Sequence, residues 1–284
     1  MGPKRRQFVR TALVVTACAI LLASAADAQR GYGQRSFREG SFPPQFPPED
    51  FVDGGLTICK LMYTQVRREA MGIGWLTDYP YAAVNLMTRA SELTKIPVSW
   101  DANHNPHPWV VRLTDAALFD CPVIVASDVG TMGISDAEAA RLREYLLKGG
   151  FLWVDDFWGT NAWEQWVSQI RKVFDAGEYP IVDLPPTHPI FRTYAPMGRV
   201  PQVTNIQFWR GSGGTETSER GADSIDVHTR AINDAHGRIM VLMTHNTDLG
   251  DSWEREGEDP GYFYQFSPPG YAVGLNVLVY LLTH

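Results

Sequence analysis

Two adjacent aspartates, Asp155 and Asp156, directly follow an apolar run at 151–154. Neighbouring carboxylates repel one another unless a cation or a hydrogen-bond donor holds them. The pair therefore indicates a metal or polar-ligand site, because hard cations prefer carboxylate oxygen and an added histidine would favour a transition metal. A structural interpretation is equally open, in which one aspartate caps the next helix while the other faces solvent.

The segment from His245 to Glu254 is the second place where polar side chains concentrate. Its Asp-x-x-Asp spacing can wrap a cation, or the loop can be satisfied by turns between aspartate side chains and its own backbone. Its candidate ligand-binding residues are His245, Asn246, Asp248, Asp251 and Trp253. The candidate metal ligands are Asp155, Asp156, His245 and Asp248, with a divalent metal as the candidate cofactor. No established metal motif occurs, and a lone histidine is more often a hydrogen-bonded wall residue.

Three further candidates come from a turn and from the aromatic residues. Asp78 and Tyr79 precede Pro80 at a predicted helix start, and Trp158 follows the aspartate pair. The numerous tryptophans could line a groove for a sugar or a peptide. Core packing is the favoured role for Trp153, Trp163 and Trp166.

Alternating strands and helices would position these residues. Short apolar runs predict strands at 56–63, 122–127, 151–154 and 238–244. Helical spacing follows Pro80, the capping box Ser135-x-x-Glu138 and a second start signal at Asn161. The alternation predicts a mainly parallel sheet between two helical layers, a three-layer α/β sandwich. In such sheets ligands bind beyond the carboxyl ends of the strands, where the candidate residues lie.

The later part of the chain departs from this alternation. Strand-like runs at 204–210 and 224–232 lie within residues 198–234, which we interpret as a β-rich excursion. An apolar segment at 272–282 follows. No second linker divides the sequence, so residues 51–284 are predicted to form one domain.

The first 28 residues have the three parts of a secretory signal: a basic head, a short apolar middle and an Ala-Asp-Ala exit at 26–28. The middle is too short for a membrane helix, which needs ~20 apolar residues. The motif Arg-Arg-Gln-Phe at 5–8 resembles a twin-arginine signal. We therefore expect export to the periplasm or beyond, with membrane contact only through the signal before cleavage. Residues 29–50 are a Pro/Gly-rich linker.

Charge and cysteine usage limit the partners and the redox state. The signal contributes +3 to the net charge of −7, so the remaining chain carries −10. Phosphate binding needs clustered Lys and Arg, and their absence outside the signal argues against nucleic acid. Cys59 and Cys121 could form a disulfide in an exported protein. Buried free thiols are the favoured interpretation, because both cysteines lie in or beside apolar segments and a chain folded before export would not depend on a disulfide.

A combination of motifs spans residues 55–284: Asp78-Tyr79-Pro80, Leu142-Arg143-x-Tyr145-Leu146-x-x-Gly149-Gly150-Phe151-Leu152, Asp155-Asp156-Phe157, His188-Pro189-Ile190-Phe191, Asn246-Thr247-Asp248-Leu249-Gly250-Asp251 and Tyr280-x-x-Thr283-His284. Together they resemble the DUF4159 family, bacterial domains of unknown function. The resemblance implies a flavodoxin-like fold similar to that of class I glutamine amidotransferases. Glutaminase chemistry is not expected, because it needs a cysteine on a tight elbow and the comparable strand ends in Asp155 and Asp156.

Two functions compete on these grounds. The first is a ligand-binding or assembly domain of the cell envelope that uses the crevice between the aspartate pair and the 245–254 segment. Its partner would be a small molecule, a glycan or an envelope protein. The second is a carboxylate- or metal-assisted hydrolase acting on a glycan or a peptide, with Asp156 or His245 as general base and Asp155 and Asp248 as ligands.

Overall fold

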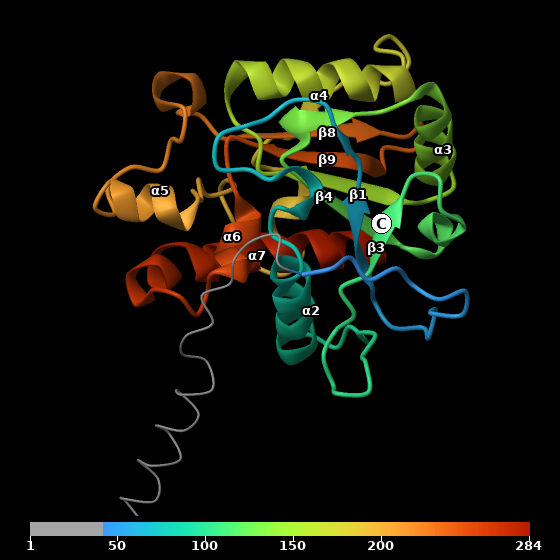
Figure 1. Ribbon diagram of the computed structural model, residues 1–284, viewed down its shortest axis with the longest axis horizontal. Helices are drawn as coiled ribbons and strands as arrows, with labels where there is room; N and C mark the ends of the chain where they lie inside the picture. The colour runs from blue at the N-terminus through green and yellow to red at the C-terminus, as the bar shows by residue number, and fades with distance from the viewer. Residues whose placement is uncertain (1–41) are drawn as a thin grey trace, which may run out of the picture. The chain divides into compact units, whose positions relative to one another are not determined.

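A seven-stranded sheet forms the centre of the described chain, residues 42–284 of the computed structural model (Figure 1). The predicted signal peptide and residues 29–41 of the predicted linker lie outside the described residues. The strands, in spatial order, are β3 (Val110–Arg112), β1 (Ile58–Met62), β4 (Val123–Ser127), β6 (Phe151–Asp155), β9 (Ile239–His245), β8 (His228–Asn233) and β7 (Val182–Asp183). The strands from β3 to β9 in this order pair in parallel, whereas β8 pairs antiparallel with both of its neighbours, β9 and β7.

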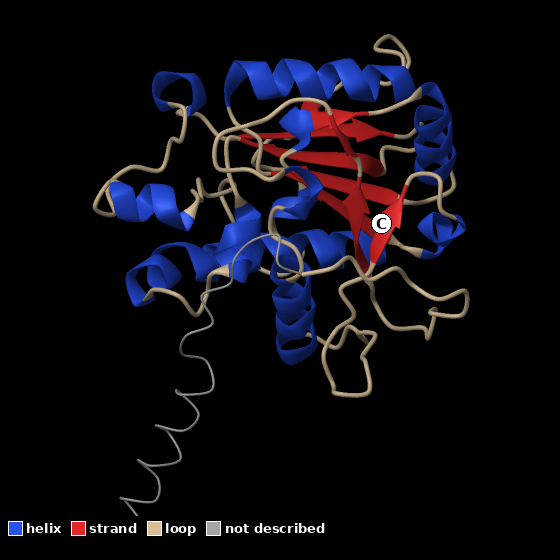
Figure 2. Cartoon of the chain, viewed as in Figure 1, coloured by secondary structure: helices blue, strands red, loops and turns tan. Residues whose placement is uncertain are grey.

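Helices cover both faces of the sheet (Figure 1 and Figure 2). The α3–α4 face carries α3 (Asp136–Leu147) and α4 (Gly159–Val173). The opposite α2–α6–α7 face carries α2 (Tyr81–Leu93), α6 (Leu249–Glu254) and α7 (Pro260–Thr283). Parallel strands enclosed in this way are apolar on both faces, which is why their sequences read as continuous apolar runs. The predicted three-layer α/β sandwich with a mainly parallel sheet is confirmed.

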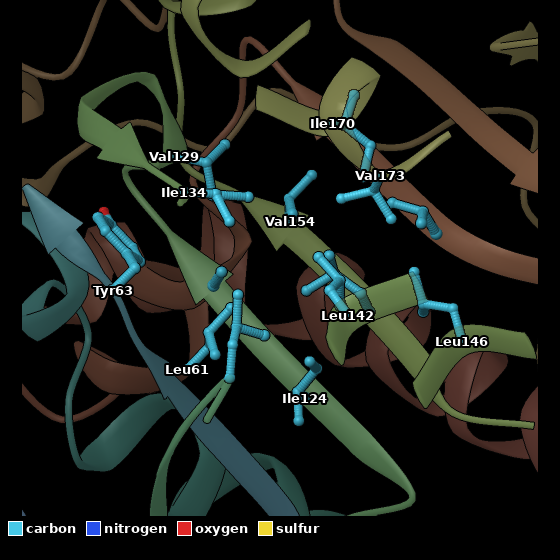
Figure 3. Close-up of a cluster of buried hydrophobic side chains, with 14 of the residues drawn as sticks. Leu61, Tyr63, Ile124, Val129, Ile134, Leu142, Leu146, Val154, Ile170 and Val173 are labelled. Carbon is cyan, nitrogen blue, oxygen red and sulfur yellow. The ribbon is translucent and has the colours of Figure 1, made fainter. Parts of the chain in front are cut away.

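The core on the α3–α4 face shows how the layers are held together (Figure 3). Leu61, Ile124 and Val154 come from three neighbouring strands and pack in one cluster with Leu142 of α3 and Ile170 of α4. All five side chains are buried. Removing apolar surface from water contributes roughly 25 cal/mol per Å², so this packing fixes the two helices on the sheet.

The two predicted helix starts on this face have different outcomes. The capping box is confirmed: the Ser135 hydroxyl accepts from the Glu138 amide, and the Glu138 carboxylate accepts from the Ser135 amide. The second start lies at Gly159 rather than at Asn161. Tertiary partners satisfy the first amides of α4, because the Gly159 N–H donates to a side chain that follows β9 and the Thr160 N–H donates to a loop aspartate.

The predicted β-rich excursion at 198–234 is wrong in most of its length. This stretch contains α5 (Ile206–Gly211), a 3-10 turn (Gly221–Ser224) and only one strand, β8. The run at 204–210 is helical because side chains cap its first amides. The Asn205 side chain accepts from the Gln207 N–H, and the Asp251 carboxylate accepts from the Ile206 N–H. The apolar segment at 272–282 is part of α7.

Cys59 and Cys121 are joined in a disulfide, so the prediction of free thiols is wrong. Both residues are completely buried, as expected from their apolar surroundings. Their Cα atoms lie 6.0 Å apart, because β1 and β4 are adjacent parallel strands and Cys121 lies just before β4. Local sequence patterns do not show that two cysteines 62 residues apart are neighbours in the fold.

The folded domain begins earlier than residue 51. Residues 42–50, the end of the predicted linker, lie against the sheet edge, where Gln45 forms a parallel bridge with Trp109. The Gln45 carbonyl accepts from the Val110 N–H at 2.8 Å, and its amide donates to the Tyr79 hydroxyl at 3.1 Å. The first of these bonds extends the sheet edge beyond β3.

Candidate functional site

A row of polar side chains crosses the α2–α6–α7 face, in the carboxyl-terminal halves of three parallel strands and at the middle of β1. It consists of Lys60 on β1, Ser127 on β4, Asp155 on β6 and Thr244 on β9. Successive side chains on a strand point to opposite faces, and Ser127 pairs with Asp155 in the β4–β6 register. The four residues therefore face the same way. They lie where ligands bind in open α/β sheets.

Hydrogen bonds link this row to Asp78, which precedes α2. The Lys60 Nζ donates to the Ser127 Oγ at 2.7 Å and to the Thr77 carbonyl at 2.6 Å. The Ser127 hydroxyl in turn donates to Asp78 Oδ2. Gly250 of α6 lies so close to the Asp78 carboxylate that any Cβ at this position would collide with it. Glycine at 250 is therefore required for α6 to approach Asp78.

Asp155 is held by different donors in the same row. The Thr244 hydroxyl donates to Asp155 Oδ1 at 2.5 Å, and the Gly250 N–H donates to Oδ2 at 3.1 Å. The Trp153 indole also donates to the Thr244 hydroxyl, at 2.9 Å. Both oxygens of Asp155 are thus engaged by the protein itself.

Asp78 belongs to two groups of carboxylates that are close enough to share a cation. Asp78, Asp156 and Asp248 each offer an oxygen, and these three atoms lie within 4.8 Å of one another. Asp78, Asp251 and Glu254 form a second such group. All five residues are buried. Asp78 Oδ1 accepts no hydrogen bond from any residue in the described part of the chain, although it is shielded from solvent. Carboxylate groups in this arrangement suit a hard divalent cation.

The charge balance of this region is unusual. All seven buried acidic residues of the described chain take part, and the buried Lys60 and Arg255 accompany them. The seven acidic residues are Asp78, Asp128, Asp155, Asp156, Asp248, Asp251 and Glu254. If every group were ionised, the excess would be five negative charges. Such an excess is costly in a low-dielectric environment, so either protons or cations must offset it.

Burial shifts four of these carboxyl groups toward their protonated forms. Loss of solvent, assisted by neighbouring carboxylates, raises the pKa of Asp155 to about 7 and that of Asp128 to about 7. Burial also raises the pKa of Asp156 and Asp248 well above the ordinary range, with Asp78 close to the first and Asp156 close to the second. The cluster without a cation therefore retains protons near neutral pH.

Backbone strain marks the same edge of the sheet. Asp78, Asp128, Asp156 and Asn246 have positive φ angles of 66°, 53°, 53° and 64°. Side chains other than glycine rarely adopt this conformation, and its cost is tolerated mainly where function requires it. Each of the four residues follows a strand or precedes a helix of the site.

A small cavity adjoins Asp78. It measures about 20 Å³, and its polar wall includes Lys60, Asp78 and Asp155. Trp153 and Trp253 line its apolar side and pack edge to face, with ring centres 5.5 Å apart. A single water needs ~10–15 Å³, so the cavity accommodates a water or an ion beside Asp78.

His245 does not join the predicted metal ligands. It lies at the end of β9 on the α3–α4 face, where its ring stacks on Phe157 at 4.8 Å and lies 5.3 Å from Trp163. Its Nε2 pairs with the Gly159 carbonyl at 3.1 Å, and burial lowers its pKa to about 4. The predicted set of Asp155, Asp156, His245 and Asp248 is therefore not brought together. Asp78 replaces His245 and Asp155 beside Asp156 and Asp248.

The alternative reading of the aspartate pair is wrong, because neither residue faces solvent or caps α4. Asp155 is 3% exposed and Asp156 is 8% exposed. Trp158 occupies the N-cap position of α4 without a side-chain cap. Its indole instead donates to Asp156 Oδ1 at 2.9 Å. Trp158 therefore positions a member of the first carboxylate group.

Most of the remaining predicted residues form hydrogen bonds that hold the loops and helices around the site in place. The Asn246 side chain accepts from the Gly159 N–H and donates to the Asp226 carbonyl, so it fixes loops. The Tyr79 hydroxyl donates to the Pro108 carbonyl at 3.0 Å. The Asp248 side chain accepts from the Asp251 N–H at 2.8 Å, which caps α6. This bond agrees with the local-turn interpretation of the loop, while Asp248 also belongs to the first carboxylate group.

Lys60, Ser127 and Thr244 were not predicted as members of the polar row. Each lies in or beside an apolar run that predicts a buried strand. A detectable signal was available for Lys60, because a lysine is rarely buried in a strand unless it is paired. The link between Ser127 and Asp78 had no such signal, since only the folded chain brings them together.

The sequence model of a family described as a domain of unknown function, DUF4159, matches residues 57–282. This range contains every residue of the polar row and of both carboxylate groups. A search of curated proteins finds no match. Among residues 42–284, no helix combines the length and apolar character needed to span a membrane.

Proposed function

The chain belongs to the DUF4159 family, and from that premise we propose that it is an exported binding domain for a divalent cation. The ligands are Asp78, Asp156 and Asp248. One observation carries the proposal: Asp78 Oδ1 is buried, accepts no hydrogen bond from a described residue, and lies on a residue of this group. A buried polar atom without a partner is costly, and a cation would supply that partner.

The donor set indicates the kind of cation. The group contains carboxylate oxygen alone, because His245 lies on the other face of the sheet. Oxygen ligands favour Ca²⁺, Mg²⁺ or Mn²⁺, whereas zinc prefers nitrogen and sulfur in addition. A divalent cation would also offset two of the five excess negative charges.

A thermal melt of the purified protein tests the proposal, with EDTA compared against Ca²⁺, Mg²⁺, Mn²⁺ and Zn²⁺. A cation at 100 times its Kd stabilises by ~2.7 kcal/mol. For a domain of this size we expect a rise in Tm of roughly 5–10 °C. The variant Asp78→Asn should lose this rise, and His245→Gln should keep it. No rise with any of the four cations would contradict the proposal.

Export to the periplasm is part of the proposal. It is supported by the signal-like first 28 residues and by the Cys59–Cys121 disulfide, because disulfides persist mainly in oxidising compartments. Cell fractionation should recover a shortened protein outside the cytoplasm. The double variant Arg5→Lys, Arg6→Lys should retain the precursor inside if the twin-arginine route is used. Unchanged export of that variant would indicate the general secretory route instead.

A second candidate function, a metal-assisted hydrolase for a glycan or a peptide, is favoured by Asp155. Asp155 lines the cavity beside Asp78, and burial raises its pKa to about 7, near the optimum for a general base at neutral pH. Release of reducing ends or free amines from purified peptidoglycan, with the stabilising cation present, tests this activity. Asp155→Asn should abolish the release while preserving cation binding. Glutaminase chemistry is not proposed, because both cysteines of the described chain are bonded to each other.

A further inference from the structure

The two carboxylate groups have one member in common, Asp78. We propose that the cluster holds two divalent cations, with the Asp78 carboxylate as the bridge between them. Asp156 and Asp248 complete the first position, and Asp251 and Glu254 complete the second. The inference rests on the proposed function, which requires only the first position.

The bridging role follows from the place of Asp78. Its two oxygens differ, because Oδ2 accepts the Ser127 hydroxyl while Oδ1 has no partner among the described residues. A carboxylate has about four lone-pair sites, so one accepted hydrogen bond leaves Asp78 able to contact more than one cation. In two-metal sites the ions lie ≈ 3.5–4 Å apart, which is within the reach of a single carboxylate.

Rigid elements supply the other ligands. Asp251 and Glu254 are three residues apart on α6, so they project from the same side of the helix. Asp248 caps the same helix. Both positions therefore share α6, which Gly250 allows to approach Asp78 closely.

The charge of the cluster favours two ions over one. Seven buried acidic residues and two buried basic residues leave five excess negative charges. One divalent cation leaves three of these charges, whereas two cations leave one. Residual charges must be removed by protonation, which the low dielectric of the site makes necessary.

Arg255 sets the order in which the two positions fill. Its guanidinium lies 3.2 Å from a carboxylate oxygen of Asp251 and 3.2 Å from one of Glu254. The second position therefore already has a positive neighbour, which repels an incoming cation. The first position, at Asp156 and Asp248, fills first and binds more tightly.

A titration of the purified full chain with Mn²⁺ tests the inference, with free Mn²⁺ measured by electron paramagnetic resonance. We expect two ions per chain, bound in two steps, and a spectrum of exchange-coupled Mn²⁺ when both positions are filled. One ion per chain would overturn the two-ion inference and leave the proposed function intact. No bound ion would overturn both.

Two matched variants locate the second ion. Glu254→Gln should reduce the stoichiometry from two to one, with the tighter step unchanged. Glu258→Gln is the control, because Glu258 pairs with the same guanidinium at 2.9 Å but belongs to neither carboxylate group. It should retain two ions. Two ions in the first variant, or one ion in the control, would contradict the assignment, and circular dichroism in EDTA would verify that both variants are folded.

Discussion

At the carboxyl ends of the strands, the two faces of the sheet carry side chains of different polarity. On the α2–α6–α7 face the strands end in polar residues such as Ser127 and Asp155, which hydrogen bonds connect to Asp78 and α6. On the α3–α4 face the neighbouring positions are Ala126 and Val154, which are buried in the apolar core. The difference arises over a single residue step along each strand, since successive side chains point to opposite faces.

Burial acts on both faces but has opposite electrostatic consequences. It raises the pKa of Asp155 to about 7 on the polar face, and it lowers the pKa of His245 to about 4 on the apolar face. Both shifts favour the neutral form. A buried acidic cluster can exchange its protons for a cation, whereas a neutral histidine packed between aromatic rings has no such role. Proximity to the strand ends is therefore insufficient to identify the site. The face of the sheet to which a side chain points determines whether the residue belongs to it.

The largest expected effects are changes of stability with pH in EDTA, measured by urea denaturation. The raised pKa of Asp155 means that the folded state binds its proton more tightly than the unfolded state, so this group costs stability as pH rises from about 4 to 7. Asp155→Asn should gain roughly 4 kcal/mol relative to the natural protein across that range. The lowered pKa of His245 has the opposite sign, and its contribution is lost as pH falls from 6.5 to about 4.

His245→Gln should therefore gain roughly 3 kcal/mol relative to the natural protein as pH falls through that window. Relative to the natural protein, Asp155→Asn gains stability as pH rises and His245→Gln gains stability as pH falls. This opposite pH dependence directly tests the difference between the two faces. Parallel pH profiles for the two variants would contradict it. Saturating cation should reduce the advantage of Asp155→Asn, because a positive charge at Asp78 offsets the repulsion from the Asp78 carboxylate and so lowers the pKa of the neighbouring Asp155.

The disulfide provides the second test, because it lies within the apolar α3–α4 core. Closing a loop between residues 62 apart stabilises by about 4 kcal/mol in the chain-entropy model. The double variant Cys59→Ala, Cys121→Ala should lose about that free energy of unfolding in urea. Its cation affinity should stay unchanged, because both cysteines lie in the core of the α3–α4 face and the carboxylate groups lie on the opposite face. A loss of cation binding in the folded variant would show that the two faces are coupled.

The fold was largely predictable, because the relevant signals are local. Continuous apolar runs gave the parallel strands of the centre, and the Ser135–Glu138 capping box gave the start of α3. The start of α4 and the helix α5 were misassigned. Their first amides are satisfied by side chains distant in sequence, such as Asp223 for Thr160 and Asp251 for Ile206. Such tertiary caps leave no pattern in the neighbouring residues.

The candidate site was predictable only in part. Asp78, Asp156, Asp248 and Asp251 were predicted because acidic residues gather at strand ends and helix starts. The grouping of ligands was not predicted, since the choice between Asp78 and His245 depends on which way each side chain points and on the spatial neighbour of each strand. The resemblance to a family limited the possible folds, but it did not indicate which residues bind a ligand.

The smallest expected effects come from removing one hydrogen bond on each face. Ser135→Ala removes the cap of α3, and Asn85→Ala removes the bond from the Asn85 side chain to the Trp253 carbonyl, which ties α2 to α6 at 2.8 Å. Each variant should lose about 1 kcal/mol of unfolding free energy. Only Asn85→Ala should weaken Mn²⁺ binding, because α6 carries Asp251 and Glu254. If the whole free energy is transmitted to the site, the affinity falls about fivefold.

Isothermal titration of both variants with Mn²⁺ measures this difference directly. Equal affinities, together with equal losses of stability, would mean that α6 holds its ligands independently of α2. The site would then depend on the capping of α6 by Asp248 and on the close approach of Gly250 to Asp78. A weaker affinity in Ser135→Ala would contradict the separation of the faces, because α3 packs only against the apolar side of the sheet.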